Sequence, residues 1–532
     1  MGRSQLVQTE GSDLDVTSPG SIERDQQGQA NKWNYNYWSS PVSPINNTPN
    51  NNSFTVGGVL RDGTTPAAPV AINWTFGYNG APGPPISLAR YWIYKFDTAV
   101  NDYANWVQIF ETGSLTAGKG FTLKGSGAAT ATQNLTFAGK PNNGTITNTV
   151  SKDQLLLIGN PYPSALDADQ FITDNIASLD VTTTNPSIDG ALYFWEHYST
   201  NSTHNLGGYQ GGYAIRNLAG GVSPSSTGVD FISGIGTTSK TAPKQYIPVG
   251  QGFFVFGNST GGDVKFKNSQ RTFIKEDNAA SQTTYRVPIT PKGLNHWTDN
   301  SDDQIAKDTY KKIRLGYNSY NETFHRQVLL AFMDEKANSE MNAGYDAYNI
   351  DDSPSDMYLL NGENELAIQG EGYFDETSSY PIGVRSDSIG KISFVLDGLE
   401  NFDKNQSIFI YDKSDDTYHN INGALYEVEL PAGTIEDRFY LRFTDKTLAT
   451  NTFNLSNSDE VIVIVNQDVT VQSSNHQIKN IAVYDLLGRK IDNYKKVNAL
   501  KFTLSHLNRT TAGLIVKITL DNDTVVSKKI IY

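Results

Sequence analysis

Residues 117–124 read Ala117-Gly118-Lys119-Gly120-Phe121-Thr122-Leu123-Lys124, and this stretch decides the architecture that we expect. Its two glycines lead into a segment in which apolar and polar side chains alternate, as they do in a β-strand with one buried face. The pattern recurs as Val249-Gly250-Gln251-Gly252-Phe253. The second copy keeps both glycines and lacks the lysine, so both places require glycine. Glycine is required where φ is positive or where neighbouring atoms lie too close for a side chain.

Three further landmarks occur twice, in the same order along the chain. They are Tyr37–Val42 with Leu157–Tyr162, Tyr91–Phe96 with Leu192–Trp195, and Leu135–Phe137 with Val264–Phe266. The spacing between copies varies, as it does when strands are retained and loops change length. We therefore predict two related all-β modules, 33–146 and 155–275. Residues 1–32 are interpreted as an N-terminal remnant that resembles the end of a β-solenoid.

Composition limits the class of protein. The 532 residues carry 42 Lys and Arg against 56 Asp and Glu, a net charge of −14, so the chain lacks the cationic footprint of a nucleic-acid-binding protein. Cysteine is absent, which excludes disulfides, thiolate metal sites and thiol nucleophiles. No stretch has the ~20 apolar residues of a membrane-spanning helix, so membrane insertion is not expected. The first residues also lack the apolar stretch of a secretory signal, so a signal peptide is not part of the sequence given.

The rest of the chain is predicted to form a third β-module, a linker and an end domain. Residues 276–445 are expected to form a β-sandwich or jelly roll with strands near 312–317, 325–332, 391–396, 407–411, 424–430 and 438–443. Residues 446–456 are interpreted as a linker, and residues 457–532 as a sandwich of about seven strands. One helix is expected from Ser164, which starts an S-x-x-D capping box, to about Ser178.

The catalytic-looking patterns are predicted to be structural. Residues 113–120 nearly spell a phosphate-binding loop, but Gly120 replaces the required Ser or Thr and a strand follows instead of a helix. Gly257-Asn258-Ser259-Thr260-Gly261 matches G-x-S-x-G, but it lies between two predicted strands and indicates a hairpin turn. No enzyme, cofactor or zinc site is expected. Calcium could bind oxygen-rich turns at three aspartate clusters, but solvated turns are the favoured interpretation: Asp299/Asp302/Asp303, Asp351/Asp352/Asp356 and Asp412/Asp415/Asp416.

Aromatic side chains are abundant, and two of them are candidate glycan contacts. Trp92 and Trp195 occupy corresponding regions of the two modules and could stack on sugar rings. The favoured alternative is that they are core and cross-strand residues. The same two interpretations apply to six other aromatic residues: Trp38, Tyr91, Tyr94, Trp106, Tyr209 and Tyr213.

The end domain resembles the type A C-terminal sorting domain of proteins exported by the type IX secretion system of Bacteroidota. The resemblance rests on 481–490 (Ile-Ala-Val-Tyr-Asp-Leu-Leu-Gly-Arg-Lys), Leu504, Leu507, Gly513–Ile518 and Lys528–Ile531. It departs from the family at Leu514-Ile515, where an aromatic residue usually follows the glycine. The resemblance implies an Ig-like sandwich that acts as an export signal. The residues it points to are Tyr484, Asp485, Gly488, Gly513 and Lys517.

The resemblance also implies partners and a location. Its partners would be the outer-membrane translocon of that system and the associated shuttle and sortase components, and the protein would be secreted or held at the cell surface. Residues 33–445 resemble modules of adhesin-like flavobacterial surface proteins, with Tyr35–Pro41, Gly118–Phe121, Ile158–Ala165 and Arg314–Tyr317 as the shared pieces. We expect a non-catalytic adhesion, binding or spacer protein, for which surface glycans are a candidate partner. The alternative is a polysaccharide-binding accessory part of a secreted hydrolase.

Overall fold

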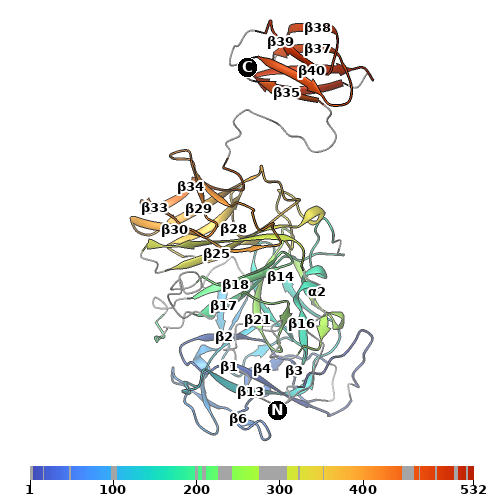
Figure 1. Cartoon of the computed structure of the whole chain (residues 1–532). Helices are drawn as coiled ribbons and strands as arrows, with labels where there is room; N and C mark the ends of the chain where they lie inside the picture. The colour runs from blue at the N-terminus through green and yellow to red at the C-terminus, as the bar shows by residue number, and fades with distance from the viewer. Residues whose placement is uncertain are drawn as a thin grey trace, which may run out of the picture. The chain divides into compact units, whose positions relative to one another are not determined.

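The computed structural model shows an all-β protein that divides into two compact units, Met1–Phe443 and Thr444–Tyr532 (Figure 1). The all-β class predicted from the sequence is confirmed. None of the described helices is long and apolar enough to cross a membrane. The structure describes residues 4–15, 17–46, 50–97, 105–181, 183–197, 202–205, 211–225, 242–274, 308–320, 324–351, 353–445, 461–465, 468–485, 488–507, 513–522 and 525–532.

The first part of the larger unit is built from short strands around one main sheet. That sheet has the order β1-β13-β5-β6, with β3 also paired to β13. The elements are β1 (Ile22–Gln29), β2 (Tyr35–Trp38), β3 (Val42–Ser43), β4 (Phe54–Thr55), α1 (Val56–Val59), β5 (Leu60–Asp62), β6 (Val70–Ala71), β7 (Asn73–Thr75), β8 (Ser87–Ala89), η1 (Arg90–Trp92), β9 (Tyr94–Phe96), β10 (Trp106–Gln108), β11 (Ser114–Leu115), β12 (Phe121–Lys124) and β13 (Thr132–Pro141).

The second part contains a five-stranded sheet of order β15-β21-β17-β18-β19 and two smaller sheets, β14-β22 and β20-β16-β23. Its elements are β14 (Ile146–Val150), β15 (Leu155–Gly159), β16 (Ala165–Asp167), α2 (Ala168–Thr173), β17 (Ile188–His197), β18 (Gly211–Asn217), β19 (Gly220–Val222), β20 (Tyr246–Ile247), β21 (Gly252–Gly257), β22 (Gly262–Phe266), η4 (Asn268–Gln270) and β23 (Arg271–Thr272).

The two parts pair their corresponding strands in the same register. Trp38 of β2 is opposite Phe121 of β12, and the matching residue of β15, Ile158, is opposite Phe253 of β21. The glycines before β12 and β21 both have positive φ, +84° at Gly118 and +72° at Gly250, as the sequence predicted.

The corresponding loops contact each other reciprocally. The Ser39 amide donates to the Gly250 carbonyl (2.8 Å), and the equivalent Gly159 amide donates to the Gly118 carbonyl (3.0 Å). Each glycine turn is therefore hydrogen-bonded to the other module. The same reciprocity is found in a two-fold symmetric dimer, where residue i of each subunit contacts residue j of the other.

Buried side chains repeat this exchange. Gln26 donates its side-chain amide to the Val249 carbonyl (2.7 Å), and Asn148 donates to the Ala117 carbonyl (3.0 Å). Gln26 lies on β1 opposite Leu135, and Asn148 lies on β14 opposite Val264. Strands β1 and β14 are thus the equivalent first strands of the two repeats.

This equivalence moves the module boundaries drawn from the sequence. Residues 22–29 were assigned to a solenoid remnant, 1–32, but they form β1, which pairs with β13 over its whole length. The first module therefore includes the strand that begins at Ile22, and it does not start at residue 33. Likewise, β14 opens the second module at Ile146, before the predicted start at 155.

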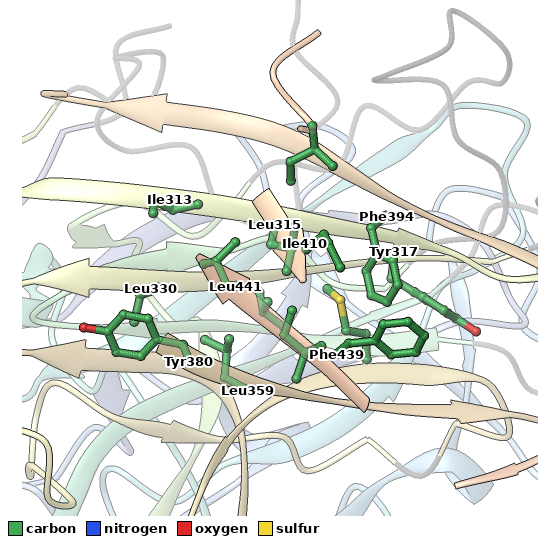
Figure 2. Packing of buried hydrophobic residues seen from close by; sticks show 14 of the residues in the cluster. Ile313, Leu315, Tyr317, Leu330, Leu359, Tyr380, Phe394, Ile410, Phe439 and Leu441 are labelled. Atoms are coloured by element: carbon green, nitrogen blue, oxygen red, sulfur yellow. The ribbon is translucent and has the colours of Figure 1, made fainter. Parts of the chain in front are cut away.

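The third part is an eleven-stranded sheet that folds around its own core. Its order is β32-β31-β34-β29-β27-β28-β25-β24-β30-β33, with β26 paired to β28, and only the β25–β28 pair is parallel. Figure 2 shows apolar side chains from opposing strands, such as Leu315, Leu330 and Phe439, gathered between them. The strands are β24 (Lys311–Asn318), β25 (His325–Phe332), β26 (Ala347–Tyr348), β27 (Asp356–Asn361), β28 (Asn364–Glu371), β29 (Ser379–Ser386), β30 (Gly390–Glu400), β31 (Phe409–Asp412), β32 (Thr417–Asn420), β33 (Tyr426–Leu430) and β34 (Gly433–Arg442).

All three parts share one hydrophobic cluster, which explains why they form a single unit. The cluster combines Tyr37 and Phe96 of the first part, Tyr193 and Phe254 of the second and Leu329 of the third. Burying these side chains together fixes the parts against one another. The boundary predicted within 276–310 falls mostly on residues 275–307, which lie outside the described residues.

The predicted helix is shorter than expected and begins later. Ser164 is not its cap, because Ala165–Asp167 form strand β16. Asp167 caps α2 instead, and its side chain accepts hydrogen bonds from the amides of Asp169 and Gln170.

The smaller unit is a two-sheet sandwich with its own core. One sheet has the order β35-β36-β39 and the other β38-β37-β40-β41. The seven strands among its described residues agree with the predicted number: β35 (Val461–Val465), β36 (Val469–Ser473), β37 (Ile478–Asp485), β38 (Lys490–Ala499), β39 (Lys501–Leu504), β40 (Gly513–Leu520) and β41 (Val525–Ile531). The linker predicted at 446–456 lies outside the described residues.

Candidate functional site

A cavity of about 670 Å³ lies where the three parts of the larger unit meet. Its volume falls in the range of small-molecule binding pockets, about 300–1,000 Å³. Strands β9 and β10 supply part of its wall, β15, β18 and β21 another part, and β26 with the residues that follow it the rest. The lining residues are Phe96, Trp106, Asp153, Leu155, Tyr213, Phe254, Phe256, Tyr348, Asn349 and Ile350.

Aromatic rings in the cavity wall hold one another in place. Phe254 packs edge-on against Phe96 (5.0 Å between centroids) and Trp106 (5.8 Å), and Phe256 contacts Tyr348 (5.7 Å). Phe96 and Phe254 are buried, whereas Trp106 and Tyr348 are partly exposed. The cavity therefore presents fixed apolar ring surfaces, which cost little conformational entropy when a ligand binds.

A buried ion-pair network supports the polar side of the cavity. Arg326, which is fully buried, binds Asp356 through two hydrogen bonds (2.6 and 2.9 Å) and Asp351 at 2.9 Å. Asp351 also accepts the amide of Tyr213 (3.1 Å), and Asn349 donates to Asp356 (2.8 Å). The network therefore connects β25 with two cavity-lining segments, and burial raises the pKa of Asp351 above its usual value.

Two polar side chains are placed to contact a ligand. Asp153 is exposed at the cavity and has a positive φ of +53°. Asn349 contributes a side-chain oxygen that accepts from the Asp351 amide at 3.3 Å and has capacity for a second hydrogen bond. Aromatic surface with a few fixed polar groups is the usual composition of a ligand site.

The structure does not place Trp92 and Trp195, the predicted glycan contacts, in the cavity wall. Trp195 is its neighbour, 5.1 Å from the ring of Tyr213, and it donates to His197 (3.0 Å). Trp92 is only 7% exposed, and its indole donates to the Tyr78 carbonyl (2.7 Å). Its burial agrees with the favoured interpretation, that Trp92 is a core residue, because other side chains cover it.

The side chains that cover Trp92 include a buried lysine. The Lys124 amine lies 3.8 Å from the centre of the Trp92 ring and 4.3 Å from that of Tyr35, and burial lowers the pKa of Lys124 to about 7. His204 stacks on Trp92 (4.7 Å) and lies within hydrogen-bond distance of Lys124 (3.1 Å). Burial, followed by the nearby lysines, lowers the pKa of His204 to about 4.

The two catalytic-looking patterns lie in strand–turn–strand settings. Ser259 is exposed between β21 and β22, and Asn258 accepts the amides of Thr260 and Gly261 there. Those strands pair with β15 and β14 rather than with each other, so the predicted hairpin is instead a crossing between sheets. The glycine turn at 118–120 leads into β12, and no helix N-terminus follows it.

The aspartates considered as calcium ligands have other partners where they are described. Asp351 and Asp356 bind Arg326, while Asp412 binds Arg438 (2.7 Å) and accepts the hydroxyl of Tyr426 (2.7 Å). Among the described residues, no group of three or more acidic or histidine side chains could hold a metal ion. The cluster at 299–303 and Asp352 lie outside the described residues.

The five predicted sorting residues lie toward one end of a single sheet in the smaller unit. Tyr484 and Lys517 are on the outer face of neighbouring strands β37 and β40. Asp485 accepts the side chain and amide of Arg489 (2.6 and 2.8 Å) across a turn in which Gly488 has φ +78°. Gly513 begins β40. Gly488 thus serves the turn itself, while the side chain of Lys517 is exposed.

Most of the cavity residues were not identified from the sequence. Trp106 and Tyr213 were among the candidate aromatics, but Phe96, Phe254 and Phe256 belong to alternating strands and have the pattern of ordinary core residues. Asp153 and Asn349 carry no motif. The positive φ of Asp153 marks it only in the structure, so the sequence offers no signal for these polar residues.

Comparison with known proteins identifies families without an assigned function. Residues 84–443 match a family model described as Domain of unknown function (DUF8693), and residues 448–532 match Domain of unknown function (DUF8694). The first match ends at the last residue of the larger unit. No curated protein matches the chain.

One solved structure aligns with the chain too weakly to inform fold or function. It is a crystal structure of Salmonella alpha-2-macroglobulin reacted with methylamine, aligned at 10% identity over 96% of this chain and 33% of that chain, with a TM-score of 0.13. This chain therefore spans about a third of that protein. Because the first family model covers well over half of the sequence, the chain belongs to the family described as Domain of unknown function (DUF8693).

Proposed function

We propose that the protein is a non-catalytic binding protein of the cell surface whose aromatic cavity holds a carbohydrate. The observation that carries the proposal is the cavity, which combines partly exposed Trp106 and Tyr348 with the polar side chains of Asp153 and Asn349. A sugar ring has faces of C–H groups and a rim of hydroxyls. Aromatic rings can stack on the C–H faces, and carboxylate and amide groups can form hydrogen bonds with the hydroxyls at the rim.

A glycan array probed with the full chain tests this function. We expect binding to neutral glycans that Trp106→Ala reduces at least tenfold, because the ring is a large share of the exposed apolar wall. Asp153→Asn keeps the shape and removes a charged acceptor, so it is expected to reduce binding without changing the fold. Phe76→Ala is the matched control, since Phe76 is 84% exposed and does not line the cavity.

Two results would contradict the carbohydrate assignment. One is the absence of glycan binding by a folded chain. The other is glycan binding that Trp106→Ala leaves unchanged, which would place the sugar elsewhere. Loss of binding with Trp195→Ala but not with Trp106→Ala would move the site to the neighbouring aromatic group around His197.

We also propose that the smaller unit acts as an export signal for the type IX secretion system. Its support is the resemblance in sequence together with the separate sandwich, which has its own core cluster and so can act as a module. The polysaccharide-binding accessory role in a secreted hydrolase is the second candidate, and the cavity favours it equally. A catalytic partner that co-purifies with the chain would distinguish that role from adhesion.

A fusion tests export. Residues 444–532 are placed behind an inner-membrane export signal and a fluorescent protein in a host that has the type IX machinery. Surface fluorescence is expected. Retention in the periplasm, while the full-length chain reaches the surface, would show that the signal lies elsewhere. Lys517→Gln, with Lys501→Gln on the other sheet as control, then tests the exposed candidate without altering a turn.

A further inference from the structure

The end of the chain carries charge of the opposite sign to the rest. Residues 461–532 contain ten Lys and Arg against five Asp, a net charge of +5, whereas residues 1–460 carry −19. Because this segment is cationic while the rest of the chain is acidic, the positions of its lysines on the sandwich determine where the positive charge gathers.

Four of these lysines lie on the outer face of the sheet β38-β37-β40-β41. The inner face is fixed by Ile481 and Val483, which pair with buried Ile518 and Val516. Residues at the alternate positions therefore point outward. The outward lysines come from three strands and are Lys490, Lys495, Lys517 and Lys529.

The lysines lie in rows across the sheet. Lys490 and Lys529 end one row, which runs through Tyr484 and Ile515. Lys517 lies in the next row and Lys495 in the one after. With strands about 4.8 Å apart and about 6.7 Å between alternate residues, adjacent lysines are separated by roughly 7–15 Å. This is close to the Debye length of about 8 Å at physiological salt, so the four charges act together on a surface.

Among the described residues, no negative charge offsets this face. None of its described strand positions is Asp or Glu, and no described carboxylate forms an ion pair with any of the four lysines. The inward Asp492 accepts the hydroxyl of Tyr494 instead (2.6 Å). The outer face of the opposite sheet is different, because Thr470 and Thr503 are paired there and Lys501 is its one described lysine.

The shape of the face selects among anionic partners. Between the lysines lie Tyr484 and Ile515 together with shorter side chains such as Ala482, Asn493 and Ser527, so the outward positions of the four strands form one continuous face. Ile491 and Val525, both about half exposed (51% and 49%), flank it. A continuous cationic face with exposed aliphatic side chains suits the headgroup region of a membrane.

We propose that this lysine face docks the smaller unit on an anionic phospholipid membrane. The docking goes beyond the proposed export and glycan functions, because it requires neither a translocon nor a sugar. Each lysine contributes its attraction to the negative surface potential, while the acidic larger unit is repelled from the same surface.

Vesicle co-sedimentation of the full chain tests the proposal, with vesicles of phosphatidylglycerol and phosphatidylethanolamine against vesicles of phosphatidylcholine alone. We expect binding to the anionic vesicles that weakens as salt is added. Each lysine changed to Gln should reduce the partition coefficient about five-fold, and the quadruple variant on the order of several hundred-fold. Replacing all four lysines by Arg should preserve binding.

A matched variant separates this face from net charge. In this variant, four exposed lysines of the larger unit are changed to Gln: Lys152, Lys391, Lys404 and Lys413. The net charge of the chain changes by the same amount as in the quadruple variant of the lysine face, but binding to the anionic vesicles should be unchanged. Circular dichroism verifies that each variant is folded. Equal loss in both quadruple variants, or no binding to anionic vesicles, would overturn the proposal. So would retention on dextran sulfate without vesicle binding, which would assign the face to acidic polysaccharide.

Discussion

Replacing Gly118 by alanine tests the reciprocal packing of the two modules. Gly118 has φ +84°, and a Cβ there would lie 2.5 Å from the side-chain nitrogen of Asn148 and 3.2 Å from both Ile146 and Phe266. All three neighbours belong to the second module. The substitution therefore combines backbone strain with a collision across the interface between modules.

The two contributions can be estimated separately. Left-handed backbone costs a non-glycine residue about 1–2 kcal/mol, and forcing an extra methyl group into a packed site costs about 1–3 kcal/mol. Gly118→Ala is thus expected to lower the free energy of unfolding by about 2–5 kcal/mol. Gly144→Ala is the matched control, because Gly144 has φ +72° with nothing within 4 Å of the added carbon. The control should cost the strain alone, about 1–2 kcal/mol.

Gly250→Ala should fall between the two. Gly250 has the same φ of +72° as Gly144, but its added carbon would lie 3.1 Å from the Ser39 carbonyl oxygen and 3.4 Å from the Phe137 ring. Replacing glycine by alanine also lowers the conformational entropy of the unfolded chain, which raises the free energy of unfolding. This contribution is common to all three substitutions, so it cancels when they are compared.

Urea unfolding followed by tryptophan fluorescence is the assay. All seven tryptophans lie before residue 300, so their emission reports on the larger part of the chain and not on the C-terminal sandwich. The expected order of stability is Gly144→Ala above Gly250→Ala above Gly118→Ala, at similar m-values. A Gly118→Ala chain as stable as Gly144→Ala would refute the argument that the turn packs tightly on the second module.

Three further outcomes are expected. Gln26→Met should lower the free energy of unfolding by about 1–3 kcal/mol in urea, because it leaves the buried Val249 carbonyl without its donor; an unchanged midpoint would contradict this. Arg326→Met should cost about 3–5 kcal/mol in thermal unfolding, since it leaves two buried carboxylates uncompensated, and full stability would show that the network is dispensable. Burial raises the pKa of Asp189 from 3.8 to about 7, so the folded state holds the extra proton between these values and stability should fall as the pH rises from about 4 to 7. Asp189→Asn should flatten that slope in denaturation measured at several pH values, and an unaltered slope would assign it to other groups.

Strand β1 shows why sequence patterns located some elements and missed others. Its inward positions include the polar residues Arg24 and Gln26, of which Gln26 donates a hydrogen bond to the Val249 carbonyl, so no hydrophobic alternation marks the strand. Strand β25, by contrast, is apolar over much of its length and matches its predicted bounds, His325–Phe332. Hydrophobic periodicity finds strands that are buried by apolar contact and overlooks those held by polar partners from distant segments.

The cavity could not be predicted for a related reason. Its walls come from separate places in the chain, and their proximity depends on how the three parts pack: Phe96 and Trp106, then Asp153, Leu155, Tyr213, Phe254 and Phe256, and last Tyr348–Ile350. A phenylalanine such as Phe256 has the same pattern whether it faces a core or a cavity. In the smaller unit, by contrast, three of the five strand pairings among the described residues join consecutive strands, and the predicted number of about seven strands agrees with the structure.

The exchange of contacts between the modules also determines when the chain can fold. The turn at Gly118 packs on Phe266 and hydrogen-bonds to Gly159, so the first module cannot complete its interior until residues well beyond its own end are available. Contacts between residues so far apart in the chain slow folding, because the long loop between them must close first. During synthesis, the N-terminal third therefore stays incomplete until the second module follows, and a chain cut off between the modules leaves the Phe137 and Gln26 surfaces uncovered. Such a fragment has the surface needed to pair with a copy of itself, in the way that the two modules pair within one chain.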